Sequence, residues 1–448
     1  MKKVLTLLFV AALTYAPHAG AQVQTITTIA GGGTDDVTNG VDAHSVRLLD
    51  PWAIAVDDNC NVYFTEPGRC VVRKVTPTGD ISTVAGTENV VGNAGNGGPA
   101  TAATLNMPYG IAVDHAGNLF IADTKNNAIR RVGTNGIITT YRAGISEPMD
   151  VAINAAGDLF IATSAGNAVL RIAAGNGPMT TLASGFDTYI PHGPYGYTGD
   201  LWWYNNCRLN GIAVDAADNV YIADHWQNYV RKITPAGYMN GYVGHMTEIG
   251  AGDYKGDGGP AASAYFNGIR RVAIDPAGRM TICDQGNCRI RRMDETGKVI
   301  SIAGGKYVAS GDGGPAIDAG FASPLGVAYD KNGYLYITDN GAKTIRRISP
   351  GTVAVAETMT HTNQLTLSPN PSHGSLRLGG TMADMETKEA ALELMDMTGA
   401  VVYKTTVAAN KGNIDAPLTL SNTITNGTYL LRVSGENSST TLPFVVAR

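Results

Sequence analysis

One unit of sequence recurs six times between residues 54 and 346, and this repetition is the strongest constraint on how the chain folds. In each copy an apolar run ends at a marker residue, usually Asp, and a second apolar run ends at another marker nine residues later. A basic residue stands seven positions after the second marker in every copy except the third, which has Leu170. Constant spacing of this kind predicts one supersecondary unit used repeatedly. The marker pairs are Asp57 and Glu66, Asp114 and Asp123, Asn154 and Thr163, Asp215 and Asp224, Asp275 and Asp284, and Asp330 and Asp339.

Each copy has the pattern of several short strands joined by turns. Four such strands in about 40 residues are typical of one blade of a β-propeller. Six copies therefore predict an all-β fold, a six-bladed β-propeller over residues 22–351. The sixth copy lacks a fourth strand, whereas a lone strand-like run, Thr27–Gly31, precedes the first copy. We expect this N-terminal run to complete the last blade and close the ring, with Thr352–Ala356 as the alternative for that position.

The N-terminus, residues 1–21, has the features of a secretory signal peptide. Lys2 and Lys3 precede an apolar run, Val4–Leu13, and the small residues Ala19–Ala21 follow it. No later segment has about 18 uninterrupted apolar residues, so we expect no membrane-spanning segment in the exported chain. The 33 Lys and Arg residues and 38 Asp and Glu residues form no block of like charge, which argues against nucleic acid as a partner.

A polar linker, residues 352–363, precedes a C-terminal segment, residues 364–448, of different composition. Short alternating apolar runs broken by Asn-Pro, Thr-Gly and Asn-Gly turns predict a small antiparallel β-sandwich there. Three motifs occur in order in this segment. Their key residues are Pro369, Asn370, Pro371, Gly374, Asp396, Gly399, Gly427 and Tyr429.

On these motifs, residues 364–448 resemble the type A C-terminal sorting domain of the type IX secretion system. The resemblance implies that this domain engages the type IX secretion machinery and is cleaved once the protein has crossed the outer membrane of a Gram-negative bacterium. It also implies that the mature protein is released or attached to the cell surface. The repeats, with Asn118–Arg131 as the fullest copy, are similar to NHL repeats. That second resemblance implies the propeller fold but no particular ligand.

Features that recur from blade to blade are expected to serve the fold. We expect the basic residues of the third strands to form ion pairs with the recurring Asp residues between blades. Two loops, Gly256–Ala261 and Gly311–Ala316, share the sequence Gly-Asp-Gly-Gly-Pro-Ala, which has an alternative interpretation as a calcium or phosphate loop. An Asp followed by glycines and Pro favours instead the start of a short helix that the Asp side chain caps.

The largest departure from the repeat is an aromatic insert before the fourth copy. Residues 186–208 hold seven aromatic residues in 23 positions, on the face that carries the loops after the second strands. Aromatic rings can stack on sugars or pack on peptide side chains, so we expect a ligand-binding rim there. The alternative is that these rings form a small core that holds the insert to the propeller. The candidate ligand-binding residues are Tyr189, His192, Tyr195, Tyr197, Trp202, Trp203, Tyr204, His225 and Trp226.

Histidines and cysteines suggest two further hypotheses. His192, His225 and His245 belong to the fourth blade and its insert, and three imidazoles suit zinc. With zinc or calcium bound, the protein would be a metal-dependent lyase or hydrolase with its site at the central channel. Cys283 and Cys288 flank the turn of one hairpin and are candidates for a disulfide in an exported protein.

The sequence contains no nucleophile elbow, zinc-protease helix or phosphate-binding loop. We therefore expect a non-catalytic binding module without a cofactor, secreted or displayed at the cell surface. Its expected partner is an extracellular carbohydrate, peptide or protein, and we expect the protein to be a monomer.

Overall fold

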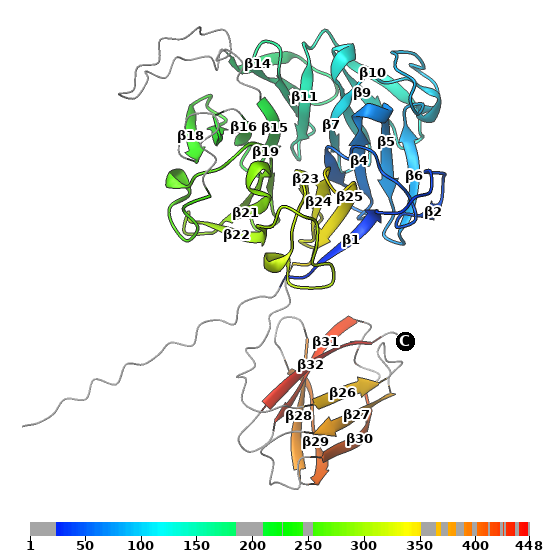
Figure 1. Cartoon of the computed structure of the whole chain (residues 1–448), viewed down its shortest axis with the longest axis vertical. Coiled ribbons are helices and arrows are strands. Elements are labelled where there is room, and N and C mark those ends of the chain that lie inside the picture. Colours follow the sequence, from blue (N-terminus) through cyan, green and yellow to red (C-terminus); the bar gives the residue numbers. More distant parts are fainter. Residues whose placement is uncertain are drawn as a thin grey trace, which may run out of the picture. The chain divides into compact units, whose positions relative to one another are not determined.

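A computed structural model describes residues 24–184, 209–225, 227–244, 254–350, 364–368, 375–381, 389–396, 401–410, 413–421, 424, 427–434 and 439–446. The chain divides into two compact units, one spanning Val23–Thr352 and one containing Val353–Arg448 (Figure 1).

The described residues of Val23–Thr352 form six antiparallel sheets of four or five strands (Figure 1). Sheet 1 contains β3 (Ile54–Val56), β4 (Val62–Glu66), β5 (Val71–Val75), β6 (Asp80–Ala85) and β2 (Val41–Asp42). Sheet 2 contains β7 (Pro108–Val113), β8 (Leu119–Asp123), β9 (Ala128–Val132) and β10 (Ile138–Ala143). Sheet 3 contains β11 (Pro148–Ile153), β12 (Leu159–Thr163), β13 (Ala168–Ile172) and β14 (Met179–Ser184).

The second half of this unit follows the same order. Sheet 4 contains β15 (Leu209–Val214), β16 (Val220–Asp224), β17 (Tyr229–Ile233) and β18 (Met239–Val243). Sheet 5 contains β19 (Ile269–Ile274), β20 (Met280–Asp284), β21 (Arg289–Met293) and β22 (Val299–Gly304). Sheet 6 contains β23 (Pro324–Tyr329), β24 (Leu335–Asp339), β25 (Thr344–Ile348) and β1 (Ile26–Gly31).

The sheets are arranged as a ring around an axis. The first strands β3, β7, β11, β15, β19 and β23 pack against one another in that order, and β23 also packs against β3. The second strand of every sheet is buried at all of its residues, because a neighbouring sheet covers each of its faces. This arrangement is a β-propeller, which confirms the predicted all-β fold class.

The N-terminal strand closes the ring, as the sequence predicts. β1 pairs antiparallel with β25, with Ile26 opposite Ile348, and completes sheet 6. The Thr25 amide also donates to Ser349 Oγ at 3.0 Å. Residues 352–356, the alternative for this position, lie outside the described residues. Sheet 1 has a fifth strand that the repeat does not predict, since the short β2 pairs with β6.

The recurring ion pairs lie within sheets, so the predicted pairing between blades is wrong. In four sheets the third-strand Arg pairs with the acidic residue that ends the second strand, at 2.9–3.4 Å. The register explains this: Arg73 lies opposite Phe64, which places its side chain on the same sheet face as Glu66, two residues further on. The pairs are Arg73 with Glu66, Arg130 with Asp123, Arg231 with Asp224, and Arg291 with Asp284.

The two Gly-Asp-Gly-Gly-Pro-Ala loops also serve the fold, but in a different way from the predicted cap. Short 3-10 helices, η5 (Ala261–Ser263) and η7 (Ala316–Asp318), do follow the Pro residues, yet neither has a side-chain cap. Asp257 instead accepts hydrogen bonds from the Arg291 guanidinium at 2.7 and 3.0 Å, and Asp312 accepts one from Arg346 at 2.6 Å. The guanidinium groups bind these carboxylates in place of the backbone amides at the helix start.

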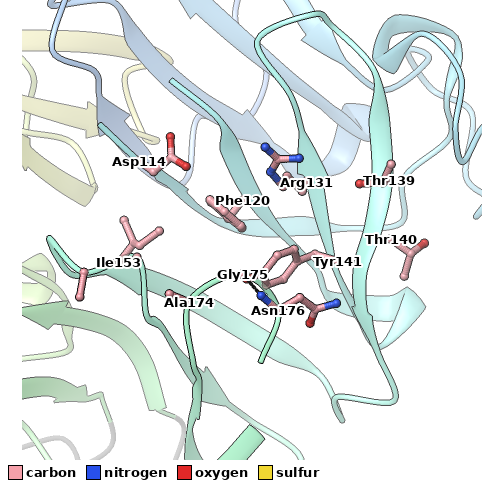
Figure 2. A pocket seen from close by; sticks show the side chains of 12 residues that line it. Asp114, Phe120, Arg131, Thr139, Thr140, Tyr141, Ile153, Ala174, Gly175 and Asn176 are labelled. Atoms are coloured by element: carbon pink, nitrogen blue, oxygen red, sulfur yellow. Dashed lines mark hydrogen bonds between the residues drawn. The ribbon is translucent and has the colours of Figure 1, made fainter. Parts of the chain in front are cut away.

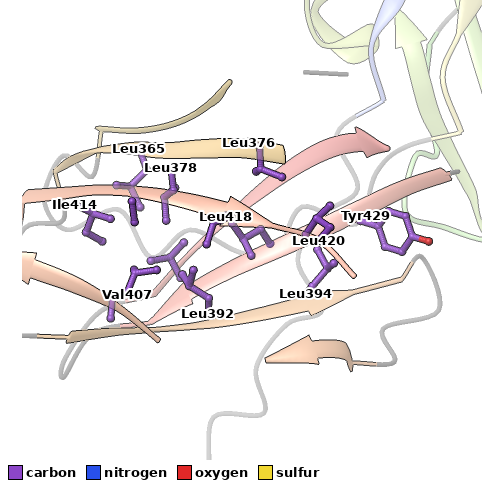
Figure 3. Packing of buried hydrophobic residues seen from close by; sticks show 14 of the residues in the cluster. Leu365, Leu376, Leu378, Leu392, Leu394, Val407, Ile414, Leu418, Leu420 and Tyr429 are labelled. Carbon is purple, nitrogen blue, oxygen red and sulfur yellow. The ribbon is translucent and has the colours of Figure 1, made fainter. Parts of the chain in front are cut away.

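The C-terminal unit is a small sandwich with one continuous hydrophobic core (Figure 3). Its strand order is β26-β27-β30-β29-β28-β31-β32, and β29 pairs with β30 at one end and with β28 along most of its length. Alternate residues of β30 are buried, which is the pattern of a strand with one face on the core. The strands are β26 (Gln364–Ser368), β27 (Ser375–Thr381), β28 (Glu389–Met395), β29 (Val401–Asn410), β30 (Asn413–Thr419), β31 (Gly427–Ser434) and β32 (Ser439–Val446).

Candidate functional site

One position of the repeat carries a different side chain in every sheet. It lies beside the start of the first strand, and because the first strands are innermost, these side chains surround the axis at one end of the ring. We call this end the loop face, because it also carries the loops between second and third strands and the connections between sheets. The six residues are Trp52, Tyr109, Met149, Asn210, Arg270 and Leu325.

Five of these six residues line a pocket of about 180 Å³ at the loop face, which we call the axial pocket. The loops that follow the second strands of sheets 2 and 3, and the connection between these two sheets, supply the rest of its wall. The lining residues are Trp52, Tyr109, Thr124, Lys125, Glu147, Met149, Ser164, Asn210 and Arg270.

One side of the axial pocket is aromatic. The rings of Trp52 and Tyr109 lie 5.0 Å apart between centroids at an interplanar angle of 58°. The Arg270 guanidinium carbon lies 5.8 Å from the Trp52 centroid, within the range of a cation–π contact. Arg270 Nε also donates to Gln285 Oε1 at 2.6 Å, which holds the guanidinium beside the indole.

The other side of the pocket is polar and partly exposed. Lys125 Nζ lies 2.6 Å from Glu147 Oε1, and Ser164 Oγ donates to Glu147 Oε2 at 3.0 Å. The side chains of Lys125 and Glu147 are 50% and 34% exposed, so a ligand can reach both. The pocket therefore combines aromatic faces with charged and neutral hydrogen-bonding groups, all held by neighbouring side chains.

A buried ion pair lies one residue further along two of the same strands. Arg271 Nη1 donates to Asp150 Oδ1 at 2.6 Å, and the Ile212 amide donates to Asp150 Oδ2 at 3.1 Å. Arg271 Nη2 reaches the Tyr109 carbonyl oxygen at 3.3 Å, so the pair connects sheets 2, 3, 4 and 5 around the axis. Burial raises the pKa of the Asp150 carboxyl, although Arg271 and the Ile212 amide oppose this rise.

Small residues at the equivalent position make room for this ion pair. A Cβ on Gly110 would lie 2.5 Å from the Asp150 Cα, and a Cβ on Gly211 would lie 2.7 Å from the Arg271 Cα. Only glycine fits where these first strands approach so closely. Glycine at positions 110 and 211 therefore leaves the space that the backbone of Asp150 and of Arg271 occupies.

Most of the predicted site residues lie outside the described part of the chain. These are Tyr189, His192, Tyr195, Tyr197, Trp202, Trp203, Tyr204, Trp226 and His245. His225 follows β16 on the loop face, and its Cε1 lies 3.1 Å from the Cβ that Gly268 would have. Among the described residues, no group of three His, Cys, Asp or Glu side chains is placed to hold a metal ion. The zinc hypothesis stays a prediction, because two of its three histidines are not described.

The predicted disulfide between Cys283 and Cys288 is not formed, and both residues are free thiols. The hairpin register pairs Cys283 with Ile290, and the 3-10 turn η6 (Gln285–Asn287) leads into Cys288 at a left-handed φ of 49°. The two thiols face different backbone oxygens: Cys283 Sγ lies 3.1 Å from the Pro324 oxygen and Cys288 Sγ 3.8 Å from the Ala322 oxygen.

The sorting-domain residues are described in part. Asp396 directly follows β28, and Gly427 and Tyr429 lie on β31, where the Tyr429 side chain is buried in the core of the unit (Figure 3). Pro369, Asn370, Pro371, Gly374 and Gly399 lie outside the described residues. No helix in the described part of the chain is long and apolar enough to cross a membrane.

No motif marks the axial pocket in the sequence, because its residues lie inside repeats of regular length. The signal that could have found it is the one repeat position at which the six copies carry six different side chains.

Two family models match parts of the chain. Residues 366–447 match the secretion system C-terminal sorting domain, and residues 88–144 match the teneurin NHL domain. Mouse teneurin-3 is 28% identical over 170 residues, 35% of this chain and 6% of that protein. Mouse teneurin-1 is 24% identical over 274 residues, 57% of this chain and 8% of that protein. The chain thus spans less than a tenth of the length of these teneurins.

Solved structures share the fold at low identity. A protein of unknown function from Bacteroides thetaiotaomicron has a TM-score of 0.56 and 20% identity, over 73% of this chain and 76% of that one. A structure titled auxiliary nutrient binding protein, from the same organism, has a TM-score of 0.55 and 17% identity, over 73% and 77%. A protein with the same title from Bacteroides ovatus has a TM-score of 0.55 and 15% identity, over 73% and 77%. The chain is a β-propeller with NHL-type repeats and a type IX C-terminal sorting domain, and it is secreted to the cell surface or the extracellular space.

Proposed function

We propose that the secreted propeller is a non-catalytic binding module that holds an extracellular carbohydrate or peptide in its axial pocket. The observation that carries this proposal is the diversity of the six axial residues. Positions that build the ring repeat from sheet to sheet, as the buried Arg and acidic pairs do. A ligand meets the ring at its axis, where the side chains do not have to repeat.

The chemistry of the pocket suits recognition of a small polar group with an apolar face. Trp52 and Tyr109 offer ring surface against which a sugar ring or a peptide side chain can pack. Lys125, Glu147 and Arg270 offer hydrogen bonds around it, and each is held by a neighbour before a ligand arrives. Groups fixed in advance lose little conformational entropy on binding.

Two further considerations support a binding role. Two of the similar structures are titled auxiliary nutrient binding proteins, although that similarity shows the fold alone. Strand β14 ends and strand β15 begins at the loop face, and the aromatic insert, residues 186–208, stands between them in the sequence. We propose that Trp202 and Trp203 extend the same binding surface.

We also propose that residues 364–448 contact the type IX secretion machinery during export, and that the secreted propeller acts as a monomer. The sorting domain supports the first of these statements. Light scattering on the purified protein tests the second.

The experiment is a screen of the purified chain on glycan and peptide arrays, with titration of every ligand captured. Trp52→Ala and Tyr109→Ala should weaken the binding of at least one captured ligand at least about tenfold, as expected when a central aromatic contact is lost. Lys74→Met, on the third strand of sheet 1, is the matched control and should bind like the wild type. Capture that is unchanged in both aromatic variants would overturn the axial assignment.

Metal analysis of the same samples tests the rival function, a metal-dependent lyase or hydrolase. Bound zinc or calcium in stoichiometric amount, lost in His225→Ala, together with chemical turnover of the captured ligand, would overturn the non-catalytic role.

A further inference from the structure

A second and larger pocket lies on the opposite face of the propeller, between sheets 2 and 3 (Figure 2). Its volume is about 500 Å³, within the range of small-molecule sites. Strands β7 to β10 supply one wall, and the turns β11–β12 and β13–β14 supply the other. We call it the interblade pocket. It does not belong to the axial pocket, with which it shares no lining residue.

This pocket coincides with the loss of a hydrogen bond that other sheets keep. In sheets 1, 4 and 6 a second-strand Tyr donates its hydroxyl to the Asp that ends the first strand, at 2.9–3.1 Å. In sheet 2 the equivalent residue is Phe120, so Asp114 has no tyrosine hydroxyl to accept. Both Phe120 and Asp114 line the pocket. The three tyrosine pairs are Tyr63 with Asp57, Tyr221 with Asp215, and Tyr336 with Asp330.

A carboxylate and a guanidinium are held in fixed positions on this wall. The buried Asn118 donates from Nδ2 to Asp114 Oδ2 at 2.7 Å, and its Oδ1 accepts from Arg131 Nη2 at 2.7 Å. Asp114 and Arg131 both line the pocket, and Asn118 connects them. The wall therefore presents an acceptor and a donor of opposite charge, with no net charge between them.

Aromatic surface completes the site. The rings of Phe120 and Tyr141 lie 5.1 Å apart in an edge-to-face arrangement, and both face the cavity (Figure 2). The backbone N–H of Asn176 donates to Tyr141 Oη at 2.7 Å, which fixes the phenol against the opposite turn. Tyr141 keeps its hydroxyl proton available for a further hydrogen bond.

We propose that the interblade pocket binds a neutral mono- or disaccharide. The hydroxyls of a sugar both donate and accept, so one can donate to the Asp114 carboxylate while another accepts from the Arg131 guanidinium. The C–H face of the sugar ring packs on Phe120 and Tyr141. An ionic ligand is disfavoured because the wall has no net charge to neutralise it. This inference rests on other residues than the proposed function does, and the two can fail separately.

The test uses saturation-transfer NMR on the purified full chain with glucose, galactose, mannose, N-acetylglucosamine and maltose as probes. Phe120→Tyr is the sharpest variant, because it restores the tyrosine that other sheets carry and should leave folding intact. The Phe120→Tyr variant places a phenol hydroxyl against the Asp114 carboxylate. The Arg131→Met variant removes the guanidinium that donates to the sugar. We expect each variant to weaken binding of the best sugar at least about tenfold, the loss typical of one charge-assisted hydrogen bond.

Two controls assign the effect to this pocket. Lys74→Met changes the residue equivalent to Arg131 in sheet 1 and should leave sugar binding unchanged. Trp52→Ala alters the axial pocket and should also leave sugar binding unchanged.

Three results would overturn the inference. The first is no saturation transfer to any of the five sugars at millimolar concentration. The second is sugar binding that survives both Phe120→Tyr and Arg131→Met. The third is binding of free glutamate, an anionic probe, or of glycine, a zwitterionic probe, in place of the sugars with the same dependence on Arg131.

Discussion

Replacing Arg271 by Met should destabilise the propeller more than any substitution on its surface. The side chains of Arg271 and Asp150 are 8% and 2% exposed, and Arg271 Nη1 lies 2.6 Å from Asp150 Oδ1. The substitution keeps most of the side-chain volume but leaves a buried carboxylate without its cation. Breaking a buried pair from one side costs about 3–5 kcal/mol, a large part of the roughly 5–15 kcal/mol that stabilises a typical domain.

The double variant Asp150→Asn with Arg271→Met separates the pair from the packing around it. Each single variant leaves one buried charge, whereas the double variant leaves none, so its loss should be smaller than the sum of the single losses by about 1–3 kcal/mol. The Arg271→Met deficit should also shrink as the pH falls. Burial raises the pKa of Asp150, and protonation of the carboxyl in acid removes the uncompensated charge.

Urea unfolding followed by tryptophan fluorescence measures these differences in the propeller alone. All four tryptophans lie within Val23–Thr352, so the C-terminal unit contributes no signal. A loss below about 1 kcal/mol in Arg271→Met, or single losses that add in the double variant, would refute the view that this ion pair holds the sheets together at the axis.

Three further predictions concern the ring and its buried carboxylates. Ile26→Ala removes a fully buried side chain of the closing strand and should lower the free energy of unfolding by about 2–5 kcal/mol in the same assay. Ile29→Ala, at a partly exposed position of the same strand, should lower it clearly less. Equal losses in the two variants would contradict the role of β1 in closing the ring. Gly110→Ala should cost about 1–3 kcal/mol because its Cβ would meet the Asp150 backbone, and Gly98→Ala, with no backbone closer than 3.4 Å, is its near-neutral control. Burial raises the pKa of the Asp50 carboxyl above its ordinary value, to about 6, and this contribution should stabilise the wild type as the pH falls from about 7 to about 4. Asp50→Asn should reduce this gain without abolishing it, because burial also raises the pKa of Asp284 to about 6, and the variant should be more stable than the wild type at pH 8 by about 1 kcal/mol, allowing for solvent screening; a pH dependence equal to that of the wild type would exclude Asp50 as a source.

The strands of the propeller were predictable because each is encoded locally. Runs such as Leu119–Asp123 combine β-forming residues with turn residues at both ends, and their constant spacing in six copies removes ambiguity. The closing role of β1 also followed from the sequence, because sheet 6 lacked a fourth strand and Thr27–Gly31 had no other partner.

Side-chain partners were harder to predict, because they depend on which face each residue presents. Arg73 and Glu66 meet within one sheet through their register, and repeat spacing alone does not distinguish that from a contact between sheets. Asp257 had a plausible local role as a helix cap, but Arg291, distant in sequence, binds its carboxylate more strongly than a backbone amide would. Strand β30 is hard to recognise in the sequence because Pro417 interrupts its β-forming residues, although Ile414, Ala416 and Leu418 alternate toward the core.

The axial pocket was missed for a related reason. Trp52, Tyr109 and Arg270 are far apart in sequence and share no motif, so only the ring brings them together. Once the fold is known, the equivalence of their positions in the repeat is plain. The interblade pocket is similar, since Phe120 is notable only when it is compared with the tyrosines of other sheets.

The most direct test is a crystal structure of the propeller with a captured ligand that binds the Phe120→Tyr variant as tightly as the wild type, and that the interblade pocket therefore does not hold. We expect the ligand to lie at the loop face and to contact Trp52 and Tyr109, with hydrogen bonds to Lys125, Glu147 or Arg270. A ligand bound to the propeller without contact to any of these residues would contradict the claim that the axial pocket is the binding site.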